Sequence, residues 1–319
     1  MDFSHLPTDH FAKSTQFTKD LYYDVYPSVD PSTGPLSQKG KVILITGASS
    51  GIGRHGIAMS FAKADARALI LAGRNKEDLE AAAVEIHAVA PAVQTDVRVI
   101  DISDETSVEN AFIGLRETYK RIDILVNNAG SGDSPLPIIE VVAAEWWYNF
   151  VRIIPEQQQL LWSWANQAGK EVMVKGTFLM TQQFLQLNGK ASAGTIINIT
   201  SAAAINSTPC LSSYSLSKLC QIQLQAFVRA ENPNVRAVSL HPGILMTRMT
   251  PPAFQRFARD TFQLVGGVAV WLATNQAAFM NGRYMSVNWS VDELVKRKEE
   301  IVSDGLLEVA LRGKFGHFK

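Results

Sequence analysis

Short runs of β-branched and other apolar residues recur along the chain from Lys41 onward, and stretches with helical periodicity separate them. Runs of this length are typical of strands buried on both faces of a sheet. We expect six strands, at residues 42–45, 68–71, 97–100, 122–126, 196–199 and 237–240. The segments between them predict helices at residues 52–64, 76–90, 104–119 and 214–230. This alternation predicts an α/β fold with a doubly wound parallel sheet, a Rossmann fold in a single domain.

Two flanking segments do not follow this alternation. Residues 1–40 are rich in Ser, Thr, Pro and Asp and form an N-terminal extension without a periodic apolar pattern. We expect the dinucleotide-binding catalytic domain at residues 41–290 and a helical tail at residues 291–319. The first 20 residues have no apolar stretch typical of a secretory signal, and no segment reaches the ~18 unbroken apolar residues of a membrane span. We therefore expect a cytoplasmic protein that does not bind a membrane.

The charges of the chain balance, with 30 Lys and Arg against 30 Asp and Glu among 319 residues. A chain without net charge has no long-range field that gathers nucleic acid, so we expect no nucleic-acid partner. The two cysteines, Cys210 and Cys220, have neither the spacing of a CxxC motif nor the number of a disulfide framework. No histidine cluster accompanies them. We predict free thiols, a reducing compartment and no metal site.

A glycine-rich turn, Thr-Gly-Ala-Ser-Ser-Gly-Ile-Gly, joins the first predicted strand to the first predicted helix. Gly47 and Gly51 allow a tight turn and close approach of the backbone to a ligand. Gly53 lets the free N–H groups of the helix N-terminus lie near a pyrophosphate. A tight strand-to-helix turn without a ligand is the alternative interpretation. The position of the turn, between strand and helix, favours a dinucleotide cofactor.

The residue at the end of the second predicted strand distinguishes enzymes that use NAD from those that use NADP. NAD enzymes usually place a carboxylate there to accept hydrogen bonds from the ribose 2′-hydroxyl, whereas a 2′-phosphate needs a cation. Here Gly73 stands in place of the acid and Arg74 follows it. A guanidinium can bind phosphate through two hydrogen bonds, and Arg54 is a second cation nearby in the sequence. We predict NADP, with NAD as the alternative; otherwise Arg74 is a solvated surface residue.

Further motifs follow the glycine turn in a fixed order. They are Asp101 after the third strand, residues 127–130 (Asn-Asn-Ala-Gly), Ser201, Tyr214 with Lys218, and Pro242-Gly243 with Thr247 downstream. In this order they resemble the motifs of the short-chain dehydrogenase/reductase family over residues 41–288, and residues 281–284 and 287–289 resemble its fungal-type branch. The resemblance implies an NAD(P)-dependent oxidoreductase with Ser201, Tyr214 and Lys218 as catalytic residues. The cofactor contacts that it implies are Gly47, Ser49, Gly51, Ile52, Gly53, Arg74, Asp101, Asn128, Ala129, Gly130, Lys175, Tyr214, Lys218, Pro242, Gly243, Leu245 and Thr247.

Tyr214 and Lys218 lie four residues apart in a predicted helix, so both side chains project from one face. The positive charge of Lys218 favours the phenolate and lowers the pKa of tyrosine from its usual value of about 10. Tyr214 would exchange a proton with the substrate oxygen while Ser201 orients the carbonyl group. The same spacing arises by chance on amphipathic helices, so the prediction also depends on Ser201 and the glycine turn.

Two features depart from the family pattern. Met173 occupies the position of an asparagine that, in the family, holds a water molecule for proton relay, and a thioether accepts hydrogen bonds only weakly. Upstream, residues 151–170 are an insertion of 20 residues. Its length keeps the reading frame, valine codons begin GT and one lysine codon ends AG, so it is a translated intron on one interpretation. On the other it is a genuine insertion that lengthens a helix and alters dimerisation or covers the site.

The leading interpretation is an oxidoreductase that moves hydride between NADP(H) and a small apolar ketone or secondary alcohol. Residues 249–260 would form part of a lid, with Phe254 and Phe257 against the substrate. The alternative is a catalytically weak NADP-binding protein that senses the cofactor or partners an active enzyme, in accordance with Met173. A homo-oligomer is a further expectation.

Two other residue types are ambiguous. We expect His241 to be packed or hydrogen-bonded rather than to act as a base. Four tryptophans belong either to the core or to an aromatic substrate pocket. They are Trp146, Trp147, Trp162 and Trp164.

Overall fold

The computed structural model describes residues 3–130, 136–147 and 172–311. The insertion at residues 151–170, with Trp162 and Trp164, lies outside these ranges. The last residues of the expected C-terminal tail, 312–319, lie outside them as well.

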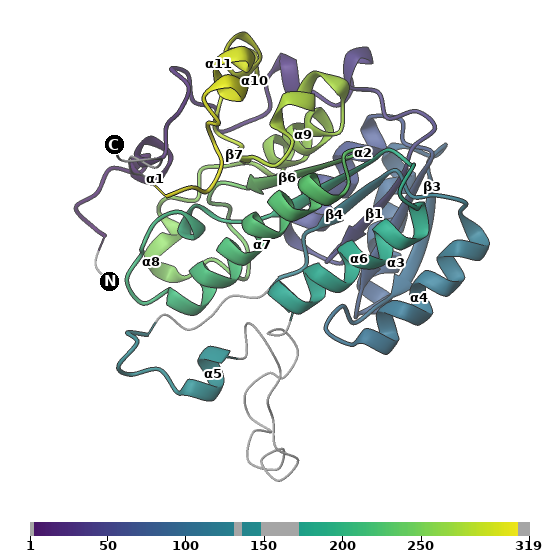
Figure 1. The fold of residues 1–319 in the computed structure, drawn as a ribbon, viewed down its shortest axis with the longest axis horizontal. Helices are drawn as coiled ribbons and strands as arrows, with labels where there is room; N and C mark the ends of the chain where they lie inside the picture. Colours follow the sequence, from purple (N-terminus) through teal and green to yellow (C-terminus); the bar gives the residue numbers. More distant parts are fainter. Residues whose placement is uncertain (1–2, 131–135, 148–171, 312–319) are drawn as a thin grey trace, which may run out of the picture.

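A sheet of seven parallel strands forms the centre of the molecule, in the order β3-β2-β1-β4-β5-β6-β7 (Figure 1). The strands are β1 (Val42–Thr46), β2 (Ala68–Gly73), β3 (Gln94–Val99), β4 (Ile124–Asn127), β5 (Gly194–Ile199), β6 (Val235–His241) and β7 (Tyr284–Ser286). The expected doubly wound parallel sheet is thus confirmed. The six predicted strands are present, and β7 is an additional edge strand that pairs with β6.

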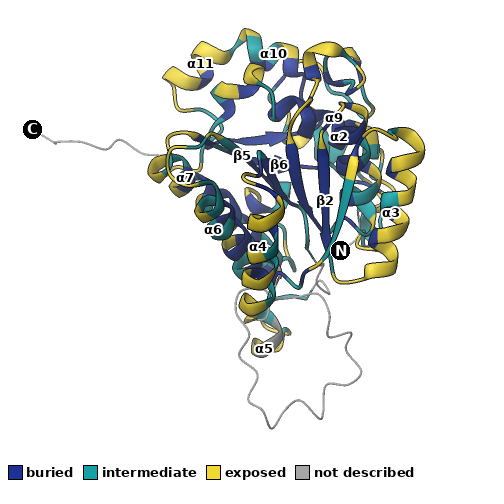
Figure 2. Ribbon diagram, turned by 90° about the vertical axis from the view of Figure 1, so that its right-hand side faces the viewer, coloured by how far each residue is buried: buried dark blue, intermediate teal, exposed yellow. Residues whose placement is uncertain are grey.

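Helices cover both faces of the sheet, with their exposed sides outward (Figure 2). One layer contains η3 (Ile52–Ala58), α2 (Met59–Lys63), α3 (Lys76–Val89) and α9 (Phe262–Leu272). The other contains α4 (Glu105–Thr118), α6 (Thr177–Asn188) and α7 (Ser212–Glu231). Shorter elements are α1 (His10–Ser14), η1 (Pro27–Val29), η2 (Gly34–Leu36), α5 (Ala143–Trp147), η5 (Val172–Gly176), η6 (Ala202–Ala204), α8 (Pro252–Gln255), η7 (Asn275–Met280), α10 (Val291–Lys296) and α11 (Lys298–Ser303).

The two faces of the sheet pack against two separate cores because successive side chains of a strand point in opposite directions. Ile43 and Ile45 of β1 belong to the core beneath η3, α3 and α9. Val42 and Leu44 belong to the core beneath α4 and α6. All five residues of β1 are buried, as the continuous apolar run predicts for a central parallel strand.

The N-terminal segment lies against the C-terminal part of the fold. Leu21 forms an antiparallel bridge with Trp289, whose indole N–H donates to the carbonyl of Thr15 at 2.9 Å. Phe11 of α1 packs edge-on against Phe257, with 4.8 Å between ring centroids. These contacts bring the beginning of the chain beside α8 and α10, elements that follow it by more than 200 residues. In the described part of the chain, no helix has both the length and the apolar character that a membrane span requires.

Helix α9 crosses η3 and α2 at very short range. A Cβ atom on Gly266 would lie 2.1 Å from Ser60 Oγ and 2.2 Å from the carbonyl oxygen of Gly56. A Cβ on Gly56 would in turn lie 2.8 Å from the carbonyl oxygen of Phe262. Glycine on both helices therefore permits backbone contact just behind the glycine-rich turn.

We expect Gly266→Ala to lower the free energy of unfolding by roughly 1–3 kcal/mol, because the added methyl group forces two backbones apart. Gly34→Ala is the matched control, since a Cβ there meets no atom within 4 Å. Urea unfolding of both variants measures the difference. Equal stability of the two variants would show that the crossing tolerates a side chain.

Candidate active site

The predicted site residues lie where parallel strands end at one edge of the sheet. The glycine-rich turn follows β1, Asn128 follows β4, Ser201 follows β5 and Pro242 follows β6. The order of the strands reverses between β1 and β4, and ligands of doubly wound sheets bind at such a switch point. The topology therefore brings segments that are far apart in the sequence to one crevice.

The glycine-rich turn fits tightly against the segment after β4. Gly47 has φ of +66°, and a Cβ on it would lie 2.9 Å from Ala129 Cα. A Cβ on Gly53 would lie 2.3 Å from the carbonyl oxygen of Gly47. The Asn128 amide donates to the carbonyls of Thr46 and Gly47, at 3.0 and 3.2 Å. Asn128 thus braces the turn, and side chains at either glycine would displace it.

At the end of β2, Gly73 and Arg74 lie beside this turn. A Cβ on Gly73 would be 3.6 Å from Ser49 Oγ, which places Ser49 next to the strand end. Arg74 is exposed and forms no hydrogen bond or ion pair with any described residue. Arg54, considered as a second cation, instead pairs with Glu85 of α3, with 2.7 Å between Nη2 and Oε1. The structure therefore favours Arg74 over Arg54 as a cation available to a ligand.

Asp101 follows β3 at the outer side of the crevice. Its Oδ1 atom accepts hydrogen bonds from the backbone N–H and the hydroxyl of Ser103, at 3.0 and 2.6 Å. Its own N–H donates to Ser107 Oγ at 3.1 Å. These bonds hold the carboxylate in a fixed orientation at the start of α4.

Ser201 lies at the start of η6, and Tyr214 and Lys218 lie in α7, which packs against η6. Ser201 precedes η6, and its Oγ accepts from the N–H of Ala203 at 3.2 Å. Tyr214 lies in the first turn of α7 and Lys218 one turn later, with Lys218 Nζ 5.9 Å from the centre of the Tyr214 ring. The structure thus brings the tyrosine and the ammonium together.

The ammonium of Lys218 is almost completely buried, with 5% of the residue exposed. It donates to the carbonyl of Ile199 at 2.8 Å and to Gln221 Oε1 at 3.2 Å. Burial disfavours the charged form and lowers the pKa of Lys218 to about 8. Gly130 lies beside it, since a Cβ there would be 3.8 Å from Nζ. The third N–H of the ammonium has no partner among the described residues.

The sequence pattern of the short chain dehydrogenase family matches residues 41–257 of this chain. The chain belongs to the short chain dehydrogenase family. It is 33% identical to the short chain dehydrogenase citE of Monascus ruber over 311 residues, which cover 94% of this chain and 99% of that protein. It is 31% identical to the short chain dehydrogenase andI of Emericella variicolor over 306 residues, or 93% of this chain and 96% of that protein. These relatives confirm the resemblance to fungal members, and the chain is an oxidoreductase.

Solved structures of short chain dehydrogenases share its fold. The enzyme from Shigella flexneri complexed with NADP has a TM-score of 0.67 and 24% identity, over 80% of this chain and 99% of that chain. A gluconate 5-dehydrogenase from Burkholderia cenocepacia, in complex with NADP and tartrate, has a TM-score of 0.65 and 22% identity. That match covers 84% of this chain and 99% of the other.

In this dehydrogenase, His241 holds the turn that carries Ser201. Its Nδ1 atom accepts a hydrogen bond from the N–H of Ala202 at 3.1 Å, as expected for a packed and hydrogen-bonded histidine. Burial lowers the pKa of His241 to about 4, so the imidazole is neutral at pH 7. A proton on Nδ1 would break the bond to Ala202, because both nitrogens of an imidazolium are donors.

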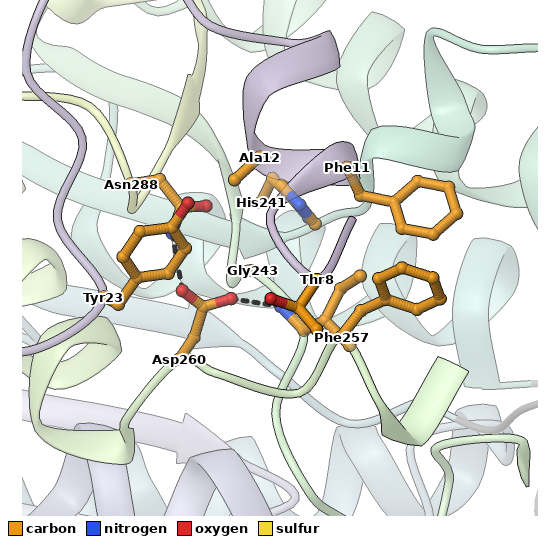
Figure 3. A pocket seen from close by; sticks show the side chains of 10 residues that line it. Thr8, Phe11, Ala12, Tyr23, His241, Gly243, Phe257, Asp260 and Asn288 are labelled. Atoms are coloured by element: carbon orange, nitrogen blue, oxygen red, sulfur yellow. Dashed lines mark hydrogen bonds between the residues drawn. The ribbon is translucent and has the colours of Figure 1, made fainter. Parts of the chain in front are cut away.

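The segment after β6 lines one side of a small cavity, and α1 lines another (Figure 3). Gly243, with φ of +77°, lies so close to Asp260 that a Cβ would be 2.3 Å from Oδ2. Asp260 accepts from the N–H of Ile244 at 2.6 Å and from the Asn288 amide at 2.5 Å. Burial raises the pKa of Asp260 to about 6, although these two donors lower it.

The remaining predicted cofactor residues lie around the same edge of the sheet. Pro242 and Leu245 are buried in the segment after β6, and Thr247 follows them, bonded to Thr250. Lys175 lies in η5, and Ile52 begins η3 behind the glycine turn.

The two phenylalanines expected to face a substrate pack against α1, and the two described tryptophans of α5 differ in burial. Phe257 is 3% exposed and packs against Phe11, so α1 covers the face expected to meet substrate. Phe254 also packs against Phe11, with 5.4 Å between ring centroids. Trp146 is half-buried and donates to Ser212 Oγ at 2.9 Å, which ties α5 to the start of α7, whereas Trp147 is 52% exposed.

Sequence reasoning missed Gln221 and Asp260. Gln221 follows Lys218 by three residues, so helical spacing alone places the two side chains on one face. Asp260 gave no such signal, because its partners Ile244 and Asn288 come from distant segments.

We expect the folded protein to lose stability on the acid side of neutrality because of His241. The unfolded chain takes up a proton near pH 6.5 and the folded chain only near pH 4. The free energy of unfolding therefore falls by about 2 kcal/mol between pH 7.5 and pH 5 from this group. His241→Asn keeps an acceptor for Ala202 and removes this contribution. Urea unfolding at both pH values measures it, and an undiminished pH dependence in the variant would contradict the assignment.

Proposed function

We propose that the protein is an NADP(H)-dependent carbonyl reductase or secondary-alcohol dehydrogenase. One observation carries the proposal: the glycine turn follows β1 and Ser201 follows β5 at the same edge of the sheet, and Lys218, with Tyr214 one turn before it, lies beside Gly130 after β4. The N–H groups of the glycine turn would hold the pyrophosphate of a dinucleotide, and Tyr214 and Lys218 would bind at its nicotinamide end.

The residues present fit a bound dinucleotide. The backbone of the turn approaches its neighbours so closely that a Cβ on Gly47 or Gly53 would fill the cradle. The third N–H of Lys218, which has no partner in the described part of the chain, would suit the hydroxyls of the nicotinamide ribose. The exposed guanidinium of Arg74, with Gly73 before it, supports a 2′-phosphate and hence NADP rather than NAD. The NADP complexes of the two solved dehydrogenases agree with this preference.

The bound cofactor supplies the hydride, and the protein supplies the proton and the orientation. In the reducing direction the Tyr214 hydroxyl donates its proton to the substrate oxygen. The positive charge of Lys218 favours the phenolate that remains. Ser201 donates a hydrogen bond to the same substrate oxygen and fixes the carbonyl. In reverse, Tyr214 accepts the proton of a secondary alcohol.

We propose a small, apolar ketone or alcohol as the substrate class. Leu245 and Met246 lie in the segment after β6, and α8 with Phe254 follows. Met246 and Met249 are 56% and 48% exposed, which supports an apolar wall on this side. Methionine side chains adapt to irregular apolar ligands.

A second candidate is an NADP-binding protein with weak turnover. Met173 supports it, because a thioether stands where relatives place the relay asparagine. Fluorescence quenching by NADPH, followed by NADPH consumption with a panel of ketones, separates the two. Binding without turnover, in the long form, in a form without residues 151–170 and in Met173→Asn, would favour the weak binder.

We also propose a cytoplasmic location and a homo-oligomer. Both cysteines are free thiols, as in reducing compartments. Phe178 of α6 and Leu216 and Phe227 of α7 are exposed, and such side chains suit a contact with a second copy.

We expect Tyr214→Phe to lower kcat by at least ~100-fold while the affinity for NADPH changes little, because the variant loses the proton but almost no contact surface. Steady-state kinetics and fluorescence titration measure the two effects. Undiminished turnover would refute the role of Tyr214.

We expect Arg74→Asp to lower the affinity for NADPH by roughly tenfold or more and so to raise the preference for NADH relative to NADPH, because a carboxylate repels the 2′-phosphate. Lys76→Asp is a matched control, since it changes the same charge two residues later. The ratio of kcat/KM for the two cofactors is the measurement. An unchanged ratio in Arg74→Asp would make Arg74 a surface residue only.

A further inference from the structure

The amide of Gln221 lies in a buried hydrogen-bond network behind Lys218. Gln221 is 2% exposed, Thr177 is 1% exposed and Met173 is completely buried. The amide Nε2 donates to the carbonyl of Met173 at 2.6 Å and to Thr177 Oγ1 at 2.8 Å. On its other side Oε1 accepts from Lys218 Nζ at 3.2 Å. The side chain thus connects the ammonium to η5 and α6.

These partners allow one orientation of the amide. An ammonium can only donate hydrogen bonds and a backbone carbonyl can only accept them. A flipped amide would place the donor Nε2 against the donor Nζ, and the acceptor Oε1 against the carbonyl oxygen of Met173. Thr177 reinforces the arrangement, because its hydroxyl donates to the same Met173 carbonyl at 2.8 Å. That carbonyl therefore accepts two hydrogen bonds from protein groups. The amide oxygen is held toward Lys218 with little freedom.

We propose that Gln221 is the positioning residue of Lys218, which fixes the ammonium between two neutral oxygens and aims its third N–H at the cofactor crevice. This inference rests on the proposed function for the catalytic meaning of Lys218. The contact itself does not depend on it. A carboxamide neither gains nor loses a proton near neutral pH, so Gln221 holds the ammonium without relaying a proton.

The surroundings make the amide oxygen important for the charge of Lys218. Among the described residues no carboxylate forms an ion pair with the Lys218 ammonium, and burial is the cause that lowers its pKa. The titratable groups on the helix of Lys218 are Tyr214, Cys220, Arg229 and Glu231, and those on η5 and β6 are Lys175, Arg236 and His241. Arg229 and Glu231 lie about three turns farther along the helix, and Arg229 pairs with Glu308. Arg236 donates to the carbonyl of Leu272 at the far end of its strand. The Gln221 oxygen is thus a main polar support of the charged form.

Two substitutions of Gln221 distinguish an electrostatic effect on Lys218 from a loss of packing around it. Gln221→Leu removes the acceptor, so we expect the pKa of Lys218 to fall by about one unit or more. Gln221→Glu retains the shape and places a carboxylate at the ammonium, so we expect a rise of similar size. A purely structural role would move both variants in the same direction or neither. Gln221→Glu also serves alone if Gln221→Leu does not fold.

Gln225 provides the control on the same helix. It lies one turn after Gln221, is 1% exposed, and both of its amide atoms are without a hydrogen-bond partner in the described part of the chain. Gln225→Leu therefore removes a buried amide that does not contact Lys218. We expect it to leave the pKa of Lys218 unchanged.

The test is an NMR titration of the full chain with ¹³C-labelled lysine, in which Lys218→Met identifies the resonance of Lys218. Opposite shifts in Gln221→Leu and Gln221→Glu, with none in Gln225→Leu, are the expected result. Unchanged values, or shifts of the same sign, overturn the inference. The alkaline limb of kcat/KM for reduction should move with the NMR value. If the Gln221 variants shift the pKa as expected but the unsubstituted protein reduces no ketone, the positioning of Lys218 by Gln221 is supported and the proposed function is contradicted.

Discussion

The site depends on keeping one ammonium charged while it is withdrawn from water. Lys218 is held by two neutral oxygens, the carbonyl of Ile199 and the amide of Gln221, rather than by a carboxylate. A charge held this way is supported but not neutralised, so its field still acts on Tyr214. A salt bridge at the same place would cancel that field.

Much of the rest of the structure fixes the groups around this ammonium. Ile199 ends β5, and the next residue, Thr200, donates to the carbonyl of Lys218 itself at 3.2 Å. His241 at the end of β6 fixes the turn of Ser201 through Ala202. Thus the ends of two neighbouring strands position a serine and a lysine, while α7 supplies the tyrosine. Rigid strands and a long helix, rather than loops, set the geometry.

The opposite side of the crevice depends on backbone contact. At Gly47 and Gly53 the turn touches the segment after β4, and at Gly266 helix α9 touches η3. These contacts leave the backbone N–H groups of the turn at the edge of the sheet, where an anion is stabilised. The two halves of the crevice therefore differ in character: one binds through backbone and the other through side chains.

The sequence was sufficient to predict the features that depend on local or repeated patterns. Continuous apolar runs such as that of β1 predicted the parallel sheet, because central strands are buried on both faces. Strand β7 was not predicted, since Tyr284–Ser286 is too short to show a pattern. Helix α9 was not predicted either, because nearly all of its residues are apolar and buried, so no polar face marks it as a helix.

Contacts across the fold were beyond the reach of the sequence. The bond from Gln221 to Met173 joins residues 48 positions apart, and only the packing of η5 on α7 reveals it. The pairing of Arg54 with Glu85 likewise depends on how α3 lies beside η3. Spacing within one helix predicted Tyr214 with Lys218, whereas partners from other elements required the structure.

A crystal structure of the protein with NADPH tests the central claim most directly. The account predicts Lys218 Nζ within about 3.2 Å of a ribose hydroxyl, with its bonds to Ile199 and Gln221 retained. It predicts the pyrophosphate at the turn that contains Gly47 and Gly53. A cofactor bound elsewhere, or a Lys218 ammonium turned away from the ribose, would contradict it.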